Sequence, residues 1–159
     1  MLGLAVAGCS SGSQAVPPVP VHVPATISAR VVLPARTMTA GSSMPGRVVV
    51  ENDTGRAIRA SGCLTLFQVA LVSGRYHPAV PWLGCLQSFT IPRGRSSYPV
   101  TVAASYLGCG QAGPGSAARA CLPGGHPPAL PAGVYRAALF QLRHLVPAPP
   151  AITIRVTRR

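Results

Sequence analysis

The chain has 159 residues and carries 14 basic side chains, all of them arginine, against two acidic ones, so its formal net charge is +12. Its length fits one domain, and no apolar run reaches the ~20 residues that a membrane-spanning helix needs. Glu51 and Asp53 are the only acids, which excludes the separate, opposed carboxylates that glycoside chemistry requires.

Near the N-terminus, the apolar residues 4–8 run directly into Cys9, which is followed by Ser10 and Ser11. This order resembles the lipobox of bacterial lipoproteins, in which the cysteine is the lipid-modified residue. The resemblance implies a truncated leader over residues 1–9, a lipid on Cys9 and a location on the outer face of the cytoplasmic membrane. Because nothing charged precedes Cys9 and the apolar run is short, we expect the start of the leader to lie further upstream. The alternative is a disordered N-terminus with an ordinary cysteine.

Residues 10–24 form a linker rich in proline and valine. Such a composition favours an extended, polyproline-like spacer that gains ~3.1 Å per residue. We expect it to hold a folded domain, residues 25–159, away from the membrane anchor.

From there on, apolar and polar residues alternate with a period of two, which is typical of half-buried strands. The clearest segments are residues 27–33, 47–51, 63–71, 98–104 and 152–156, with short edge pieces at 58–60 and 87–91. Residues 134–145 fit either a helix or a strand, and their β-branched and aromatic start favours a strand. Proline recurs at the junctions, where it stops both helix and sheet. The sequence predicts an all-β, antiparallel sandwich of seven to nine strands.

Three motifs support a more specific fold: the strand and turn at residues 48–55, the turn at residues 91–94 and the Leu-Pro-Ala-Gly-Val-Tyr step at residues 130–135. Their order resembles that of bacterial immunoglobulin-like β-sandwich domains, in which a tyrosine such as Tyr135 often closes a corner. Intracellular-proteinase-inhibitor-like domains and secreted actinobacterial lipoproteins share this order. The resemblance covers most of residues 25–159 and implies a fold rather than an activity.

Four cysteines follow Cys9 in the chain, namely Cys63, Cys85, Cys109 and Cys121. An even number in a small exported domain indicates two disulfides, for which three pairings exist. We favour Cys63–Cys85 and Cys109–Cys121. A zinc site with four thiolates is the alternative, but these cysteines lack the close C-x-x-C spacing of such sites.

Residues capable of catalysis are scarce. Two of the histidines, His77 and His126, precede proline, and none of the four has a metal-binding spacing to another histidine or a cysteine. Residues 25–159, the expected domain, contain no G-x-S-x-G elbow to hold a serine and no phosphate- or dinucleotide-binding loop. We therefore predict a non-enzymatic domain without a metal site or a cofactor. Glu51 and Asp53 are expected to cap a turn or to pair with Arg47 and Arg56.

Two loops are candidate binding surfaces for a partner. Residues 75–84 carry Arg75, Tyr76 and Trp82, a combination found at interface anchors, although a lone tryptophan is also common in a core. Residues 108–130 form a long loop with Arg119 and His126, and long loops in small domains are usually functional or disordered.

The arginines are scattered singly, with few aromatic neighbours, which argues against nucleic-acid binding. We favour instead a solvated basic surface that results only from a biased amino-acid composition. Such a surface would attach weakly to anionic lipid or wall groups. The sequence thus predicts a membrane-anchored module that binds another envelope protein or an anionic wall or lipid component. Two alternatives are a protease-inhibitor-like domain with residues 75–84 as its reactive loop, and a structural spacer.

Overall fold

The computed structural model describes residues 26–62, 66–78, 87–110, 119–141 and 144–158. Nine strands account for most of this chain: β1 (Ile27–Val32), β2 (Thr37–Thr39), β3 (Ser43–Asn52), β4 (Ile58–Gly62), β5 (Phe67–Val72), β6 (Gln87–Ile91), β7 (Gly94–Ala103), β8 (Gly133–Gln141) and β9 (Ile152–Thr157). The all-β prediction is confirmed, and residues 134–141 belong to a strand rather than to a helix.

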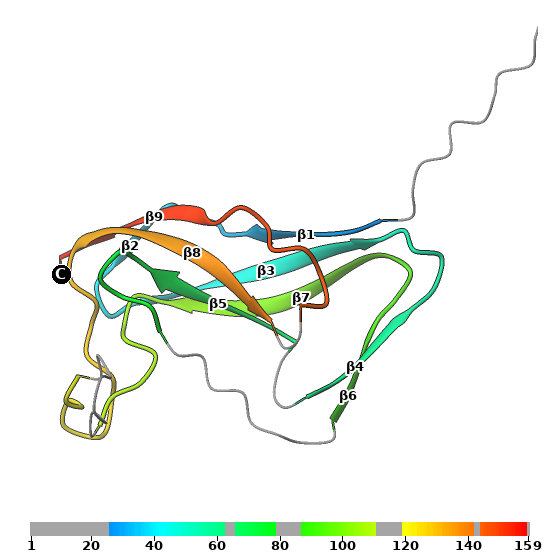
Figure 1. Cartoon of the computed structure of the whole chain (residues 1–159). Helices are drawn as coiled ribbons and strands as arrows, with labels where there is room; N and C mark the ends of the chain where they lie inside the picture. The colour runs from blue at the N-terminus through cyan, green and yellow to red at the C-terminus, as the bar shows by residue number, and fades with distance from the viewer. Residues whose placement is uncertain (1–25, 63–65, 79–86, 111–118, 142–143, 159) are drawn as a thin grey trace, which may run out of the picture.

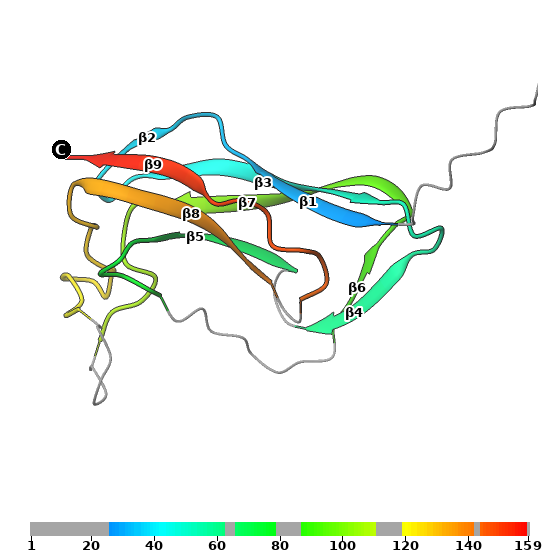
Figure 2. The same ribbon diagram turned by 45° about the horizontal axis from the view of Figure 1, so that its top comes forward.

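The strands form two packed sheets and a smaller ribbon (Figures 1 and 2). One sheet has the order β1-β3-β7 and the other the order β2-β9-β8-β5, while β4 and β6 pair separately. Two sheets stacked in this way, with strands that are neighbours in space but distant in sequence, form a β-sandwich. The ribbon of β4 and β6 continues from β3 and β7 and extends away from the sandwich (Figure 1).

Inward-facing side chains from both sheets fill the core between them. The largest fully buried ones include Phe67 and Leu71 on β5, Ile154 on β9, and Val48 and Val50 on β3. These residues lie at alternate positions, as the period of two predicted. Val49 is also buried, with 2% exposure, because β3 is the middle strand and its register places Val49 between Arg30 and Ser97.

Strand β2 is absent from the sequence prediction, and it changes the character of its sheet. The chain leaves the first sheet after Val32, crosses the edge of the sandwich and pairs Thr37–Thr39 with β9 in a parallel direction. The sheet is therefore mixed rather than purely antiparallel. Near this crossing Leu33 lies over Gly46, where a Cβ would approach Leu33 Cδ2 to 2.5 Å.

Asn52 holds the bend between the sandwich and the ribbon. It is the one polar residue that is fully buried in the described part of the chain. Its amide nitrogen donates to the carbonyl oxygens of Arg56 at 2.9 Å, Pro92 at 3.0 Å and Ile91 at 3.4 Å. Its Oδ1 accepts from Thr54 Oγ1 at 2.6 Å, so one side chain links the turn after β3 to the turn before β7.

The acidic residues beside this turn do not act as the sequence predicted. Glu51 pairs with Arg95, its register partner on β7, at 3.6 Å, and not with Arg47 or Arg56. Both ends of this pair are largely exposed, so it contributes little stability. Asp53 is exposed, and the turn is held by Asn52 instead.

The other corner of the sandwich is closed by Tyr135 at the start of β8. Its hydroxyl donates to the carbonyl oxygen of Pro131 at 2.9 Å, while its ring is buried. This contact is a tyrosine corner, as the sequence resemblance implied. In the part of the chain that the structure describes, no helix is long and apolar enough to cross a membrane.

Candidate functional site: a stapled end of the sandwich

The two arms of the long connection between β7 and β8 are hydrogen-bonded to each other where they leave the sandwich. Leu130 donates from its backbone nitrogen to Ala104 O at 2.9 Å, and Tyr106 donates in the same way to Pro128 O at 3.0 Å. The two arms of the connection therefore run side by side before it opens into a loop. Leu130 is fully buried and anchors the returning arm in the core.

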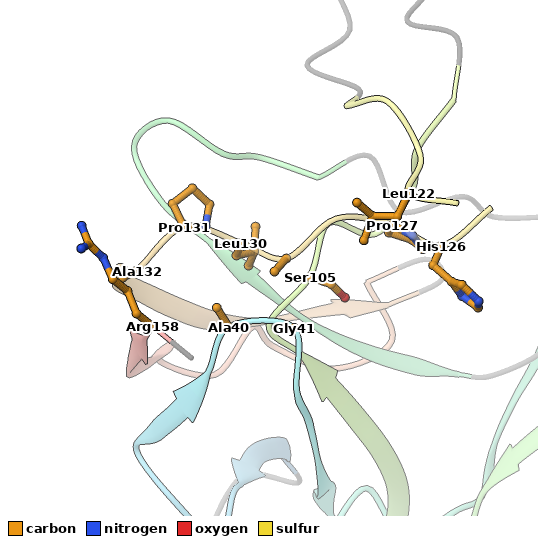
Figure 3. Close-up of a pocket in the computed structure, with 11 residues that line it drawn as sticks. Ala40, Gly41, Ser105, Leu122, His126, Pro127, Leu130, Pro131, Ala132 and Arg158 are labelled. Atoms are coloured by element: carbon orange, nitrogen blue, oxygen red, sulfur yellow. The ribbon is translucent and has the colours of Figure 1, made fainter. Parts of the chain in front are cut away.

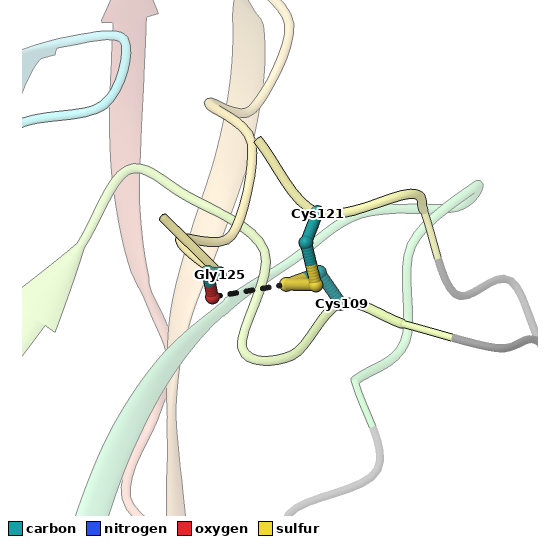
Figure 4. Close-up of a disulfide and its surroundings, with 3 residues drawn as sticks. All are labelled: Cys109, Cys121 and Gly125. Carbon is teal, nitrogen blue, oxygen red and sulfur yellow. Dashed lines mark hydrogen bonds between the residues drawn. A yellow bond between two sulfur atoms is a disulfide. The ribbon is translucent and has the colours of Figure 1, made fainter. Parts of the chain in front are cut away.

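Beyond these arms, a disulfide closes the loop. Cys109 and Cys121 are bonded, with their Cα atoms 4.8 Å apart, as predicted from the sequence. Gly110 N donates to Arg119 O at 3.1 Å, and Cys109 Sγ lies 3.5 Å from Gly125 O (Figure 4). The disulfide thus fixes Arg119 relative to the start of the loop, because Arg119 precedes Cys121 by only two residues.

A second turn reaches the same place from β5. Ser73 and Tyr76 exchange backbone hydrogen bonds of 2.9 and 3.2 Å and close a tight turn with Arg75 near its tip. The ring of Tyr76 packs edge-on against Tyr106, with the ring centres 4.9 Å apart. Tyr76 Oη also accepts from Leu107 N at 2.9 Å. The side chain of Tyr76 therefore joins two loops that are about thirty residues apart in sequence.

Arg119 completes this group. Its guanidinium carbon lies 5.7 Å from the centre of the Tyr106 ring, within the range of a cation–π contact. We call Tyr76, Tyr106 and Arg119 the end cluster. Both tyrosines are half-buried and Arg119 is exposed, so the cluster combines a packed base with an accessible cation.

Burial raises the pKa of Tyr76 above its ordinary value of 10.0, with a smaller rise from Tyr106 and an opposing effect of the Leu107 hydrogen bond. Burial likewise raises the pKa of Tyr135, to which Tyr106 and Tyr76 add. Both phenols are therefore neutral hydrogen-bonding groups at physiological pH.

A shallow hollow of about 820 Å³ lies beside the same loop (Figure 3). It is lined by Ser105, Leu122 and Leu130 from the connection, by Ala40 and Gly41 from the turn after β2, and by His126 and Arg158 near its ends. Ser105 lines the hollow and Tyr106 packs on Tyr76, because successive residues of an extended segment point to opposite sides. Leu122, with 49% exposure, is a large apolar side chain open to solvent at this site.

The structure brings together residues that the sequence assigned to two separate surfaces. Tyr76 and Arg119 meet through Tyr106, whereas His126 lines the hollow and Arg75 lies exposed in the turn. Trp82, Cys9 and the predicted pair Cys63–Cys85 lie outside the described residues. Tyr106 and Arg158 were not among the site residues predicted from the sequence. An aromatic residue three positions before a bridged cysteine was the available signal for Tyr106.

The side chains at this end are of few chemical kinds. Across the described residues, no group of three or more histidine, cysteine, aspartate or glutamate side chains is placed to hold a metal ion. The hollow is lined mainly by small and apolar residues, with the exposed Leu122, His126 and Arg158 at its rim, and the aromatic rings and Arg119 belong to the end cluster. Comparisons with protein-family models, with curated proteins and with solved structures gave no match, so this site rests on its own geometry.

Proposed function

We propose that this protein is a non-enzymatic, lipid-anchored envelope protein that binds another envelope protein through the stapled end of its sandwich. The observation that carries the proposal is the meeting of Tyr76 with Tyr106 and Arg119. Two loops from different parts of the chain converge there and are fixed by a ring contact, a cation–π contact and a disulfide. Such convergence gives a surface that needs little ordering when a partner binds.

The placement of this surface relative to the N-terminus supports the proposal. Ile27 on β1 pairs with Asn52, whereas Ala103, which leads into the stapled loop, pairs with Ser43 at the other end of β3. A strand of ten residues spans about 30 Å, so the chain enters the sandwich at one end and the end cluster lies at the other (Figure 1). A domain tethered through Cys9 and residues 10–24 would present the cluster away from the membrane.

The residue types also support binding to a protein. Tyrosine and arginine are enriched among residues that dominate binding energy, and they act best when surrounding contacts exclude water. Tyr76 and Tyr106 are already packed, and Leu122, one residue after the bridged Cys121 on the same loop, offers exposed apolar area. The disulfide supports a location in an oxidising compartment outside the cytoplasm.

Site-directed photocrosslinking in the native envelope tests this proposal. A photoreactive amino acid is placed at Leu122, an exposed position three residues after Arg119 on the stapled loop, or as a matched control at Arg59, an exposed position on the β4–β6 ribbon. We expect one protein adduct of defined mass from position 122 and none from position 59. Arg119→Gln should abolish that adduct, whereas Arg93→Gln, which removes an equal charge elsewhere on the surface, should leave it unchanged.

Other outcomes would point elsewhere. Equal adducts from both positions, or an adduct that persists in Arg119→Gln, would contradict a binding site at the stapled end. Inhibition of a protease by the purified domain, with no adduct at position 122, would support the inhibitor hypothesis instead. Labelling with an alkyne fatty acid tests the anchor separately: we expect label on the wild-type protein and none on Cys9→Ala.

A further inference from the structure

A second hollow, of about 630 Å³, lies on the sandwich where the chain crosses from β1 to β2. Its lining includes Arg36 and Thr37 at the start of β2, Thr153 and Arg155 on β9, and Val134 on β8. It shares no residue with the hollow at the stapled end. The crossing explains the hollow, because β2 pairs only with residues 155–157 and leaves the first half of β9 without a neighbour on that side in the described chain.

The arginines at this hollow are placed close together by the backbone. Arg155 N donates to Arg36 O at 2.8 Å, which holds the two residues next to each other. The register of β8 and β9 pairs Val134 with Arg155 and Arg136 with Thr153, so Arg136 is a diagonal neighbour of Arg155. All three arginines are exposed. Arg36 and Arg155 both line the hollow, and Arg136 lies two register positions away on the neighbouring strand.

This positive charge has no acidic side chain to balance it. The chain contains two acidic side chains, Glu51 and Asp53, and neither lines the hollow. Glu51 pairs with Arg95 on the other sheet, and Asp53 lies in the turn that follows β3. Like charges on neighbouring strands destabilise a sheet, so an anion from outside the chain would stabilise this arrangement.

We propose that this hollow binds a phosphate group. Guanidinium groups bind phosphate through two parallel hydrogen bonds, and Thr37 and Thr153 contribute hydroxyl donors from the same lining. Together these donors suit the several oxygens of a phosphate better than the two of a carboxylate. The charge is therefore concentrated at a defined place, in contrast to the diffuse attachment that composition alone suggested. The proposal is independent of the partner at the stapled end.

A charge-matched pair of variants tests the proposal. R36Q/R155Q removes two charges from the hollow, and R30Q/R47Q removes two equally exposed charges from the outer face of the other sheet. The probe is a short fluorescein-labelled polyphosphate, and its anisotropy is measured at about 0.15 M and about 0.5 M salt, since diffuse attraction fades as the Debye length shrinks. We expect R36Q/R155Q to weaken binding at least tenfold and R30Q/R47Q at most twofold, with the gap between them wider at the higher salt.

A third variant keeps the charge and removes only a hydroxyl. Thr153→Val is expected to weaken polyphosphate binding about threefold, the loss of one hydrogen bond to a charged group, while the net charge is unchanged. Equal losses in the two arginine pairs, or no loss in R36Q/R155Q, would overturn the site. Thermal unfolding of each variant verifies that it is folded, and the crosslink at position 122 should persist in R36Q/R155Q.

The source of the phosphate is decided with vesicles. If the natural ligand is a lipid headgroup, R36Q/R155Q should lose binding to phosphatidylglycerol vesicles by a factor similar to its loss for polyphosphate. If the ligand is a soluble or wall-linked phosphate polymer, the R36Q/R155Q and R30Q/R47Q variants should bind these vesicles equally. Their affinities for polyphosphate should still differ. Both results support the phosphate site and differ only in what supplies it.

Discussion

The two ends of this sandwich are held in opposite ways. At the end where β4 and β6 leave the sheets, one buried amide, that of Asn52, connects two turns through carbonyl oxygens of both. At the other end, a disulfide and main-chain hydrogen bonds hold the loop after β7. The side chains of Arg119 and Leu122 remain exposed there.

This difference separates a structural role from a binding role. A buried side chain that satisfies three carbonyl oxygens is committed to the fold and presents nothing to a partner. At the stapled end, backbone hydrogen bonds, the disulfide and the packed rings of Tyr76 and Tyr106 hold the loop, and other side chains, such as those of Arg119 and Leu122, stay exposed. Variants that remove the support of one end at a time test this difference between the two ends.

The largest effect is expected at the Asn52 end. Asn52→Ala leaves the carbonyl oxygens of Arg56 and Pro92 without their donor, and we expect the free energy of unfolding to fall by about 3 to 4 kcal/mol. Thr54→Val, which removes one hydrogen bond to Asn52 Oδ1, should cost about 1 kcal/mol. Urea unfolding measures both. Equal costs in the two variants would show that Asn52 is not the central support of the bend.

Removal of the disulfide should have a smaller and more local effect. Cys109→Ser combined with Cys121→Ser frees a loop of sequence separation 12, for which we expect a loss of about 2 to 3 kcal/mol. Hydrogen exchange should accelerate around Arg119 and Gly110, while β3 and β7 keep their protection. Uniform acceleration over the whole sandwich would mean that the stapled loop supports the fold as much as Asn52 does.

Much of the fold was predictable because alternation of side chains is a local property. The inward faces of β5, β7 and β9 follow directly from the period of two, and the turn at Asn52 follows from its residue types. Strand β2 escaped prediction because three residues are too few to show a period, and because its parallel partner, β9, is 118 residues away in the register pair Thr37–Arg155. The residue types of the turn predicted the place of Asn52 in the chain. Its burial was not predictable, because it depends on two turns, distant in sequence, that meet around this side chain.

The candidate site was predictable only in part, for a related reason. Residue types identified Tyr76, Arg119 and His126 as candidates on two loops, and spacing favoured Cys109–Cys121. That Tyr76 reaches Tyr106 depends on β5 and β7 ending at the same end of the sandwich, which no local pattern encodes. The clustering of Arg36 with Arg155 depends in the same way on the parallel pairing of β2.

Loss of the single hydrogen bond at the tyrosine corner, near the stapled end, should cost less than loss of the disulfide. Tyr135→Phe removes the hydrogen bond to Pro131 O while keeping the buried ring, so we expect a loss of about 1 kcal/mol in the free energy of unfolding. Tyr135→Ala should cost about 3 to 4 kcal/mol, because it also removes a buried aromatic ring. The difference between the two variants, measured by thermal unfolding, separates the hydrogen bond from the packing of the ring.

The smallest effect concerns pH, and it arises near the stapled end. Burial raises the pKa of Tyr76 and of Tyr135, so the folded protein holds these protons more tightly than the unfolded chain, where the pKa is 10.0. The stability that this difference contributes is fully present below about pH 10 and is lost as the pH rises through the raised values. The Asn52 amide does not titrate and has no such dependence.

We therefore expect urea unfolding midpoints to be constant between about pH 8 and 9 and to decline above about pH 10. The combined change of Tyr76→Phe and Tyr135→Phe should make that decline shallower, although it lowers stability at neutral pH through the lost hydrogen bonds to Leu107 N and Pro131 O. Asn52→Ala should lower the midpoint at every pH and leave the slope of the decline unchanged. If the alkaline slope is the same with and without the two hydroxyls, burial of these phenols does not control the response of this end to pH.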